Sequence, residues 1–405
     1  MEIKQLQLIH YRNYEKSSFE FSEGTNIIFG KNGQGKTNLL ESVFVLCRGY
    51  SHRSGRLADL IRFGDDSMGI SSSFKTGSTS HRLRLTVIQG RKKWELDGKT
   101  ESGFAKIGRL AGCILFEPDD LEIVKSGPER RRAFINEELS GLNPVYRATY
   151  RTFEKVRSQR NALLKDIRFK KIPADQARAL LAPWDQQLTN AAENVFRERA
   201  EYLLKLNREA KKLHERLSGT GEKLSLEYQS NVFSGFDELP RIRQVYLDKL
   251  EENLTSDIER GYTAAGPHAD ELVVKIDGVP ARQFASQGQQ RTAAISLKLA
   301  HIALYREKNG EAPVVLLDDI LSELDEGRQR NLLSVLSGVQ SFITCTDPAF
   351  ADVIAEGTAR VCEEGSGQDI RKFRINSGEL IPKPAAAYNE PAAVHSAMKY
   401  SKESN

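Results

Sequence analysis

Residues 30–37 constrain the fold of this chain more than any other segment. They read Gly-Lys-Asn-Gly-Gln-Gly-Lys-Thr, which is the pattern G-x-x-x-x-G-K-[ST] of a phosphate-binding loop (P-loop). An apolar run at residues 26–29 precedes the loop and helix-forming residues follow it, so the sequence predicts a strand, a tight loop and a helix. Glycine lets backbone N–H groups approach phosphate oxygens, Lys36 can neutralise the β- and γ-phosphates, and Thr37 can offer a hydroxyl to Mg²⁺. We therefore expect a nucleoside triphosphate site at Gly30, Lys31, Asn32, Gly33, Gln34, Gly35, Lys36 and Thr37.

The composition is that of a globular protein rather than of a secreted or membrane protein. The chain has 405 residues, of which 39% are hydrophobic and 28% are charged, and its formal net charge is only +4. Any affinity for nucleic acid must therefore come from local patches. The four cysteines are far apart and form no C-x-x-C pair, which argues against a zinc site or a disulfide framework. No segment resembles a signal peptide or approaches the roughly 18 apolar residues of a membrane span, so we expect a cytoplasmic protein with no membrane partner.

The periodicity of apolar residues predicts an α/β head divided by a helical arm. Alternation at residues 3–21 indicates a hairpin that turns at Arg12-Asn13, and shorter alternating runs follow at 82–88 and 94–96. Helical spacings dominate residues 144–217, where Pro173 and Pro183 are expected to bracket a short piece between two long helices. Strand-like runs return at 272–276, 314–317 and 341–344, with a helix expected at 326–336. We expect a head of residues 1–122 and 256–380, an antiparallel helical arm of residues 123–255, and a disordered tail of residues 381–405.

Two acidic residues end the apolar run at 314–317. Side chains at the carboxyl ends of strands line the ligand-binding edge of an α/β sheet. We expect Asp318 to hold Mg²⁺ together with Thr37, and Asp319 to orient the attacking water, so that Lys36, Asp318 and Asp319 are the candidate catalytic residues. The alternative is an ordinary boundary between a strand and a turn.

Residues 286–291 precede a third helical pattern. Ser286 and Gln289 form an S-x-x-Q capping box, and a capped helix needs no ligand. The same hydroxyl, the N–H of Gly288 and the helix N-terminus could instead hold a γ-phosphate. Spacing alone does not decide between the two interpretations.

The P-loop, the S-x-G-Q helix and the D-D strand, in this order, resemble the ABC-type ATPases, whose heads dimerise around ATP. Five blocks make the resemblance narrower, at residues 117–121, 127–132, 261–268, 286–292 and 316–325. They resemble the RecF family of bacterial recombinational-repair proteins, an SMC-like branch of these ATPases. The likeness covers about residues 1–381.

The resemblance implies an ABC-type head split by a helical arm, ATP and Mg²⁺ as cofactors, an ATP-dependent homodimer and slow, DNA-stimulated hydrolysis. It implies that Ser286, Gly288 and Gln289 reach the ATP of the partner subunit, and that Asp325 crosses the same interface. Arg12 and Arg53 lie where related heads place phosphate-sensing arginines, although either could be a solvated surface residue. The resemblance also implies binding to DNA where single strand meets duplex and at gaps, with RecO and RecR as partners that help load RecA. Recombinational DNA repair, replication-fork recovery and the SOS response are the implied settings.

The chain departs from the family pattern at three places. Ala269 follows Gly-Pro-His where the family usually has an arginine. Asp319 stands where many ABC ATPases have the longer glutamate, which predicts slow turnover. No clear Q-loop glutamine or switch histidine is present, and the strand at 341–344 runs into Cys-Thr-Asp, so we expect a threonine at the switch position.

A basic segment between residues 144 and 172 is the first candidate for DNA binding. It contains nine Lys or Arg residues and two acidic residues, a net charge of +7. Cationic side chains three and four residues apart form a stripe that can follow phosphates without reading bases. The expected DNA-binding residues are Arg151, Lys155, Arg160, Lys170 and Lys171. The alternative is a helix made basic for solubility.

Arg130-Arg131-Arg132 is a second basic candidate. Its alternative is a helix start paired with Glu137 and Glu138.

Three other protein classes compete with the RecF-like interpretation. A small-molecule P-loop kinase needs no S-x-G-Q helix, the ATP-binding subunit of an ABC transporter needs a membrane partner, and an SMC head needs a much longer coiled coil than an arm of roughly 75 residues.

Overall fold

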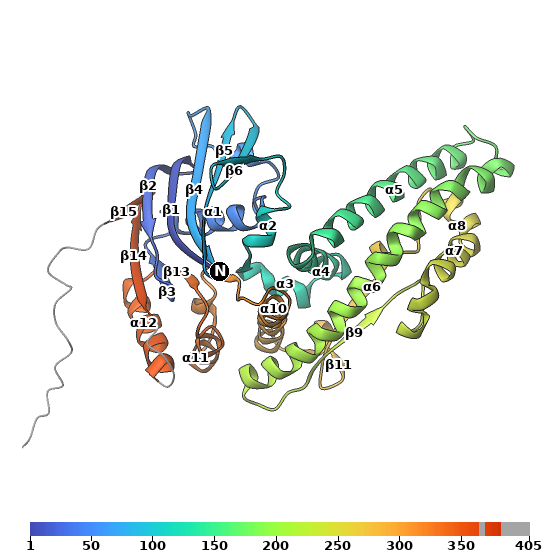
Figure 1. Cartoon of the computed structure of the whole chain (residues 1–405). Helices are drawn as coiled ribbons and strands as arrows, with labels where there is room; N and C mark the ends of the chain where they lie inside the picture. Colours follow the sequence, from blue (N-terminus) through green and yellow to red (C-terminus); the bar gives the residue numbers. More distant parts are fainter. Residues whose placement is uncertain (364–368, 382–405) are drawn as a thin grey trace, which may run out of the picture.

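The computed structural model describes residues 1–363 and 369–381, and most of the expected tail at 381–405 lies outside these residues (Figure 1). The strands are β1 (Glu2–Tyr11), β2 (Tyr14–Glu20), β3 (Thr25–Phe29), β4 (Ser67–Thr76), β5 (Thr79–Ile88), β6 (Arg91–Leu96), β7 (Lys99–Glu101), β8 (Cys113–Phe116), β9 (Leu224–Gln229), β10 (Glu271–Ile276), β11 (Val279–Pro280), β12 (Val314–Leu317), β13 (Ser341–Cys345), β14 (Ile370–Asn376) and β15 (Glu379–Ile381). The α-helices are α1 (Lys36–Arg48), α2 (Ile107–Leu110), α3 (Glu122–Lys125), α4 (Pro128–Leu142), α5 (Pro144–Arg168), α6 (Ala177–Ser218), α7 (Ile242–Glu252), α8 (Leu254–Arg260), α9 (Ala281–Phe284), α10 (Gln287–Asn309), α11 (Glu326–Val335) and α12 (Pro348–Glu363). Short 3₁₀ turns are η1 (Leu57–Leu60), η2 (Pro118–Leu121), η3 (Ala174–Gln176), η4 (Phe236–Arg241), η5 (Pro267–Ala269) and η6 (Leu321–Glu323).

Two six-stranded sheets form the head. One is antiparallel, with the strand order β2-β1-β4-β5-β6-β7, and it contains the hairpin predicted at residues 3–21. The other has the order β15-β14-β3-β13-β12-β8, in which every neighbouring pair is parallel except β15 with β14. The P-loop strand β3 therefore lies between β14 and β13, in the interior of this sheet.

Side-chain alternation in the parallel sheet places helices on both of its faces. On one face Ile28, Leu316 and Phe342 join a core that includes α1 and the antiparallel sheet. On the other face the neighbouring positions, such as Ile27 and Ile343, join a core with α10, α11 and α12. A parallel sheet needs cover on both faces, which is why strands β8 and β12 are apolar and buried throughout rather than alternating with polar residues. The predicted α/β class is confirmed.

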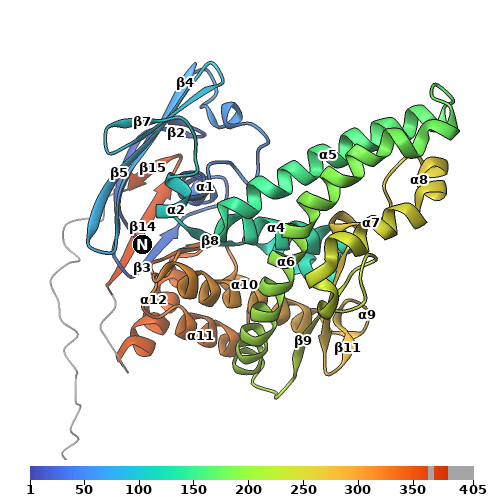
Figure 2. The same ribbon diagram turned by 45° about the vertical axis from the view of Figure 1, so that its right-hand side comes forward.

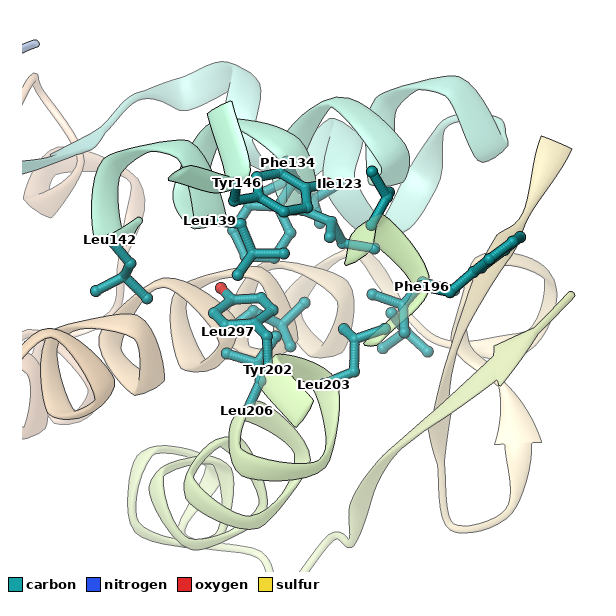
Figure 3. Packing of buried hydrophobic residues seen from close by; sticks show 14 of the residues in the cluster. Ile123, Phe134, Leu139, Leu142, Tyr146, Phe196, Tyr202, Leu203, Leu206 and Leu297 are labelled. Atoms are coloured by element: carbon teal, nitrogen blue, oxygen red, sulfur yellow. The ribbon is translucent and has the colours of Figure 1, made fainter. Parts of the chain in front are cut away.

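Helix α10 connects the head to the arm. Its residues Ile295, Leu299 and Ile302 belong to the head core, while Leu297 and Leu304 belong to a separate core formed with α4, α5 and α6. Figure 3 shows Leu297 packed near Tyr202 and Leu206 of α6 and near Leu139 of α4. A single helix with two apolar faces thus holds the head and the arm together.

The arm is an antiparallel pair of long helices, α5 and α6, that projects away from the head (Figures 1 and 2). The prediction that Pro183 ends the connecting piece is wrong, because α6 begins at Ala177 and runs through Pro183. Proline removes one backbone hydrogen bond, but burial of Leu181 and Leu188 on either side of Pro183 stabilises the helix across it.

The strand predicted at residues 272–276 is present as β10, but it lies apart from both head sheets. It pairs with β9 and β11 in a three-stranded antiparallel sheet. Leu272, Val274 and Ile276 of this strand are buried in the same core as α4, α5 and α6. In the ranges that the structure describes, no helix is long and apolar enough to cross a membrane.

Candidate nucleotide site and basic arm

The P-loop begins where β3 ends at the carboxyl edge of the parallel sheet. Gly30, Gly33 and Gly35 all have positive φ angles, of 154°, 77° and 114°. A Cβ at Gly35 would lie 2.7 Å from Nδ2 of Asn13. The P-loop pattern therefore requires glycine for backbone conformation as well as for close approach of a ligand.

Neighbouring segments brace the loop from outside. The Tyr14 hydroxyl donates to the carbonyl of Gly35 at 2.8 Å, and the Asn13 amide donates to the carbonyl of Gln34 at 3.0 Å. On the other side, the N–H of Gly378 donates to the same Gln34 carbonyl at 2.9 Å. These contacts come from the start of the β1–β2 hairpin's second strand and its turn, and from the turn between β14 and β15, which the motif itself does not predict.

Lys36 lies against the loop that it belongs to. Its Nζ donates to the carbonyl oxygens of Gly30 at 2.7 Å and Lys31 at 3.0 Å. Burial lowers the pKa of Lys36, and the negative charges of Asp319 and Asp318 partly oppose this shift. The ammonium is thus held at the mouth of the loop, where phosphate oxygens could replace the two carbonyls.

Asp318 lies where β12 ends, beside the start of α1. The Thr37 hydroxyl donates to Asp318 Oδ1 at 3.1 Å, so the two predicted Mg²⁺ residues are in direct contact. Burial raises the pKa of Asp318, and hydrogen bonds from Thr344 and Thr37 act in the opposite direction. One hydroxyl and one carboxylate suit Mg²⁺, which takes one or two protein oxygens and fills its remaining positions with phosphate oxygens and water.

Asp319 has an unusual backbone conformation. Its φ is +56°, a region that non-glycine residues rarely adopt and that is enriched at functional sites. The Asp319 N–H donates to the Thr344 hydroxyl at 2.9 Å, and Thr344 in turn donates to Asp318 Oδ1 at 2.7 Å. Thr344, at the end of β13, therefore contacts both acidic residues, whereas the sequence indicates only that a threonine lies near the switch position.

Arg12 and Arg53 converge on one buried carboxylate of the P-loop helix. Arg12 donates to both oxygens of Glu41, through Nε at 2.9 Å and Nη2 at 2.8 Å, and Nη1 of Arg53 lies 3.7 Å from Oε2 of Glu41. Burial would raise the pKa of Glu41, but the hydrogen bonds of Arg12 and Ser51 outweigh it and hold the pKa below its usual range. Sequence reasoning missed Glu41, because an acidic residue inside an apolar helix gives no sign of its partner.

The capping box at the start of α10 is confirmed. Ser286 Oγ accepts from the N–H of Gln289 at 3.2 Å, and Gln289 Oε1 accepts from the N–H of Ser286 at 2.8 Å. Asp325 caps the nearby α11, where it accepts from the N–H of Arg328 at 2.9 Å. In the part of the chain that the structure describes, no hydrogen bond or ion pair joins residues 286–289 to the P-loop.

The structure divides the expected DNA-binding residues into two groups. Arg151, Lys155, Lys170 and Lys171 are exposed on the arm. Arg160 is fully buried, and donates from Nε to Asp185 at 2.6 Å and from Nη1 to Asp257 at 2.8 Å. The prediction that Arg160 contacts DNA is therefore wrong, because its helical position faces the interior of the arm, where only a paired charge is tolerated.

The triple-arginine segment is largely structural. Arg131 is buried and forms a two-pronged ion pair with Glu271, with both N–O distances 2.8 Å. Arg132 donates to the carbonyl of Asp270 at 2.9 Å, beside Ala269. Arg130 is exposed. The sequence offers Glu137 and Glu138 as partners of these arginines, but neither pairs with them in the described residues. Glu138 instead pairs with Arg48 across the head–arm junction at 2.9 Å, and Glu137 accepts a hydrogen bond from Tyr50.

A cavity of about 720 Å³ lies at the head–arm junction rather than at the P-loop. Its lining includes Tyr50, Phe104, Tyr150, Arg147 and Arg151. Of the expected site residues, only Arg151 borders it. Among the described residues, no group of three or more His, Cys, Asp or Glu residues is arranged to hold a metal ion. Thr37 and Asp318 could supply one hydroxyl and one carboxylate oxygen to Mg²⁺.

Comparison with known proteins points to one family. A model of the RecF/RecN/SMC N-terminal domain matches residues 2–363. The chain is 35% identical to the DNA replication and repair protein RecF of Clostridium tetani, over 94% of this chain and 100% of that protein. It is 36% identical to RecF of Bacillus velezensis, with the same coverage of both chains.

Solved structures agree with the sequence relatives. A structure of the recombination mediator protein RecF with ATP, from the RecFOR pathway, superposes with a TM-score of 0.81 at 30% identity, over 94% of this chain and 97% of that one. An SMC head bound to the C-terminal winged-helix domain of ScpA superposes at 0.53 with 16% identity, over 94% of this chain and 96% of that one, which supports the shared fold alone.

Proposed function

Because this chain belongs to the RecF family of DNA replication and repair proteins, we propose that it is an ATP-gated, DNA-binding clamp. ATP closes a homodimer, and the closed dimer binds DNA at gaps and at junctions of single strand and duplex. The protein acts in the cytoplasm in recombinational DNA repair, replication-fork recovery and the SOS response. RecO and RecR are its partners in loading RecA, a role consistent with the RecFOR pathway named for its solved structural relatives.

The proposal rests mainly on one observation: within one chain, the phosphate-binding groups form two separate clusters. The P-loop, Thr37 and Asp318 form one cluster, whereas Ser286, Gly288 and the start of α10 lie outside its hydrogen-bonding network. Two such clusters suit an arrangement in which the α10 terminus of one copy faces the P-loop of another. Each ATP would then be held by both subunits.

The chemistry of the site supports slow hydrolysis. Lys36 would neutralise the β- and γ-phosphates, and Thr37 and Asp318 would hold Mg²⁺, which would supply stabilisation of negative charge on the phosphates. Asp319 orients the attacking water, while Thr344 fixes the backbone of Asp319 and one oxygen of Asp318. The aspartate is one methylene shorter than glutamate, so water is held less well and ATP persists long enough to keep the dimer closed.

DNA binding rests on the exposed cations of the arm. Arg151, Lys155, Lys170 and Lys171 lie on α5 and on the loop that follows it. Lysine and arginine side chains on an exposed helix can neutralise phosphates without reading base sequence. Binding should therefore weaken steeply as salt rises.

The test is binding of the full-length protein to a gapped duplex, with and without ATP and Mg²⁺, at two salt concentrations. A Ser286→Arg variant places a bulky cation at the start of α10, and we expect it to lose the gain in affinity that ATP gives. Ser337→Arg is the matched control. Ser337 is an exposed serine that follows the C-terminal end of α11, whereas Asp325 caps the opposite end of that helix. An ATP effect that survives Ser286→Arg would exclude the shared-site dimer, and binding that ignores ATP altogether would exclude the gated clamp.

A further inference from the structure

The end of the arm farthest from the head carries two exposed aromatic rings. We define the arm tip as residues 165–172, at the end of α5, together with residues 258–262, at the end of α8. Figures 1 and 2 show that α8 lies beside the far end of the helical pair. Phe169 is 67% exposed and Tyr262 is 50% exposed. Aromatic rings are normally buried, so two on one small surface indicate a binding role.

The two rings flank a direct contact between the segments that carry them. Nη1 of Arg168 donates to the carbonyl of Arg260 at 2.9 Å. Gly261 packs against the Arg168 side chain so closely that a Cβ on Gly261 would lie 3.3 Å from its Cδ. Phe169 follows Arg168 and Tyr262 follows Gly261, so the rings belong to two segments that are held together.

A small apolar cluster fixes this surface. Leu164, Ile167, Ala177 and Leu181 are buried together, with Leu254 and Ile258 of α8 packed against them. The rings therefore stand on a packed base rather than on a loose loop. Rigid aromatic side chains bind with little loss of conformational entropy.

The surface around the rings is cationic. Residues 165–172 contain Lys165, Arg168, Lys170 and Lys171 against the single acid Asp166, and residues 258–262 add one cation and one acid, Arg260 and Glu259. Lys171 pairs with Asp166 at 2.8 Å. Within the described ranges, the other three cations of residues 165–172 have no carboxylate partner, and the guanidinium of Arg168 also lies 5.8 Å from the centre of the Phe169 ring. The tip therefore combines positive charge that is free to bind anions with aromatic surface.

One exposed aromatic ring of the head lacks this combination. Phe63, on the head, is fully exposed, but its neighbour Arg62 pairs with Glu15 and Asp65. Asp65 also pairs with His10. The cations near Phe63 are thus neutralised locally, which makes Phe63 a suitable control.

We propose that the arm tip binds single-stranded DNA, with unpaired bases stacked on Phe169 and Tyr262 and phosphates along Lys165, Arg168 and Lys170. The inference rests on the proposed DNA-binding function and assigns the single-stranded part of its substrate to one site. Bases in a duplex stack on one another, whereas unpaired bases have free faces that aromatic side chains can cover. Arg151 and Lys155, which lie nearer the head, are assigned to the phosphates of the duplex part.

The experiment compares three DNA probes by fluorescence anisotropy with the full-length protein: oligo(dT), a gapped duplex and a blunt duplex. We expect the variant Phe169→Ala/Tyr262→Ala to bind oligo(dT) at least about tenfold more weakly, the loss typical of removing a stacked base. We expect weaker binding to the gapped duplex as well, and a change of less than about twofold for the blunt duplex. Phe63→Ala should leave all three affinities unchanged.

A second measurement tests stacking directly. In Phe169→Trp, an aromatic ring is retained, so we expect affinity for oligo(dT) to be preserved and the tryptophan fluorescence to be quenched when the oligonucleotide binds. Unchanged binding of oligo(dT) by the alanine variant would overturn the proposal, as would an equal loss on the blunt duplex. Failure of the wild-type protein to bind any of the three probes would instead refute the DNA-binding function itself.

Discussion

Arg160 offers a sharp test of whether the basic arm helix serves structure or DNA at each position. Its side chain is fully buried, and it pairs with Asp257, which is also fully buried, and with Asp185. Replacing Arg160 with methionine keeps most of the volume but removes the charge. In this variant Asp257 would keep the hydrogen bond from the N–H of Ala264, at 3.0 Å, but would have no opposite charge beside it.

The expected cost of Arg160→Met is about 3–5 kcal/mol in the free energy of unfolding, the range for breaking a buried ion pair by removing one partner. Asp185 should add little to this cost, because its side chain is partly exposed and water can solvate it. A loss of that size is a large fraction of the 5–15 kcal/mol that typically separates folded from unfolded states. We therefore expect a clear shift of the unfolding midpoint.

The assay is urea denaturation followed by the fluorescence of Trp184, the residue before Asp185, in a Trp94→Phe background. Arg151→Met is the matched control, because Arg151 lies on the same helix but is exposed. We expect Arg151→Met to unfold like the parent within about 0.5 kcal/mol. It should weaken DNA binding, with a salt slope reduced by about 0.9 for one lost phosphate contact.

The two variants should thus show opposite effects: Arg160→Met should lose stability, whereas Arg151→Met should lose affinity for DNA. In conditions where it stays folded, Arg160→Met should bind DNA within about twofold of the parent. An unfolding curve for Arg160→Met that matches the parent would refute the buried-pair argument. A reduced salt slope in the folded Arg160→Met protein would show that the sequence-based assignment to DNA was right after all.

Four further outcomes are expected. Lys36→Met should abolish ATP-induced dimerisation, measured by light scattering after gel filtration, because the loop loses the ammonium assigned to the β- and γ-phosphates. A dimer that still forms would contradict the shared ATP site. Asp319→Asn should keep ATP binding but trap the dimer with ATP bound, and phosphate release at the parental rate would show that Asp319 does not orient water. Gly35→Ala should weaken ATP binding, measured by calorimetry, because φ is +114° and the new Cβ would collide with Asn13. Burial lowers the pKa of His301 to about 4, so the unfolded chain binds more protons than the folded chain between about pH 4 and 6.5. This group should therefore lower stability by up to about 3 kcal/mol as pH drops through that window. His301→Gln should make that part of the stability curve less steep, and a curve of unchanged slope would contradict the argument.

Local patterns in the sequence are enough to predict the elements that carry nucleotide chemistry. The P-loop, the apolar strand before Asp318 and the capped helix at Ser286 each depend on residues close together in the chain, so spacing reveals them. The same holds for the hairpin that turns at Arg12, where alternation over two strands sets the pairing. In each case the backbone conformation is dictated by glycine, capping or period-two burial, which are properties of a short segment.

Only the tertiary structure decides which charges are free and which are paired. Arg151 and Arg160 look alike in a basic helix, yet one faces solvent and the other pairs with acids 25 and 97 residues away in the chain. Glu41 and Thr344 join the site through contacts between segments far apart in sequence. Arg12 donates to Glu41 of α1, and Thr344 donates to Asp318 after β12. The chain therefore determines its phosphate-binding loop locally, whereas the partners of its buried charges depend on long-range packing, because the cost of burying a charge is met by whichever opposite charge the fold brings near.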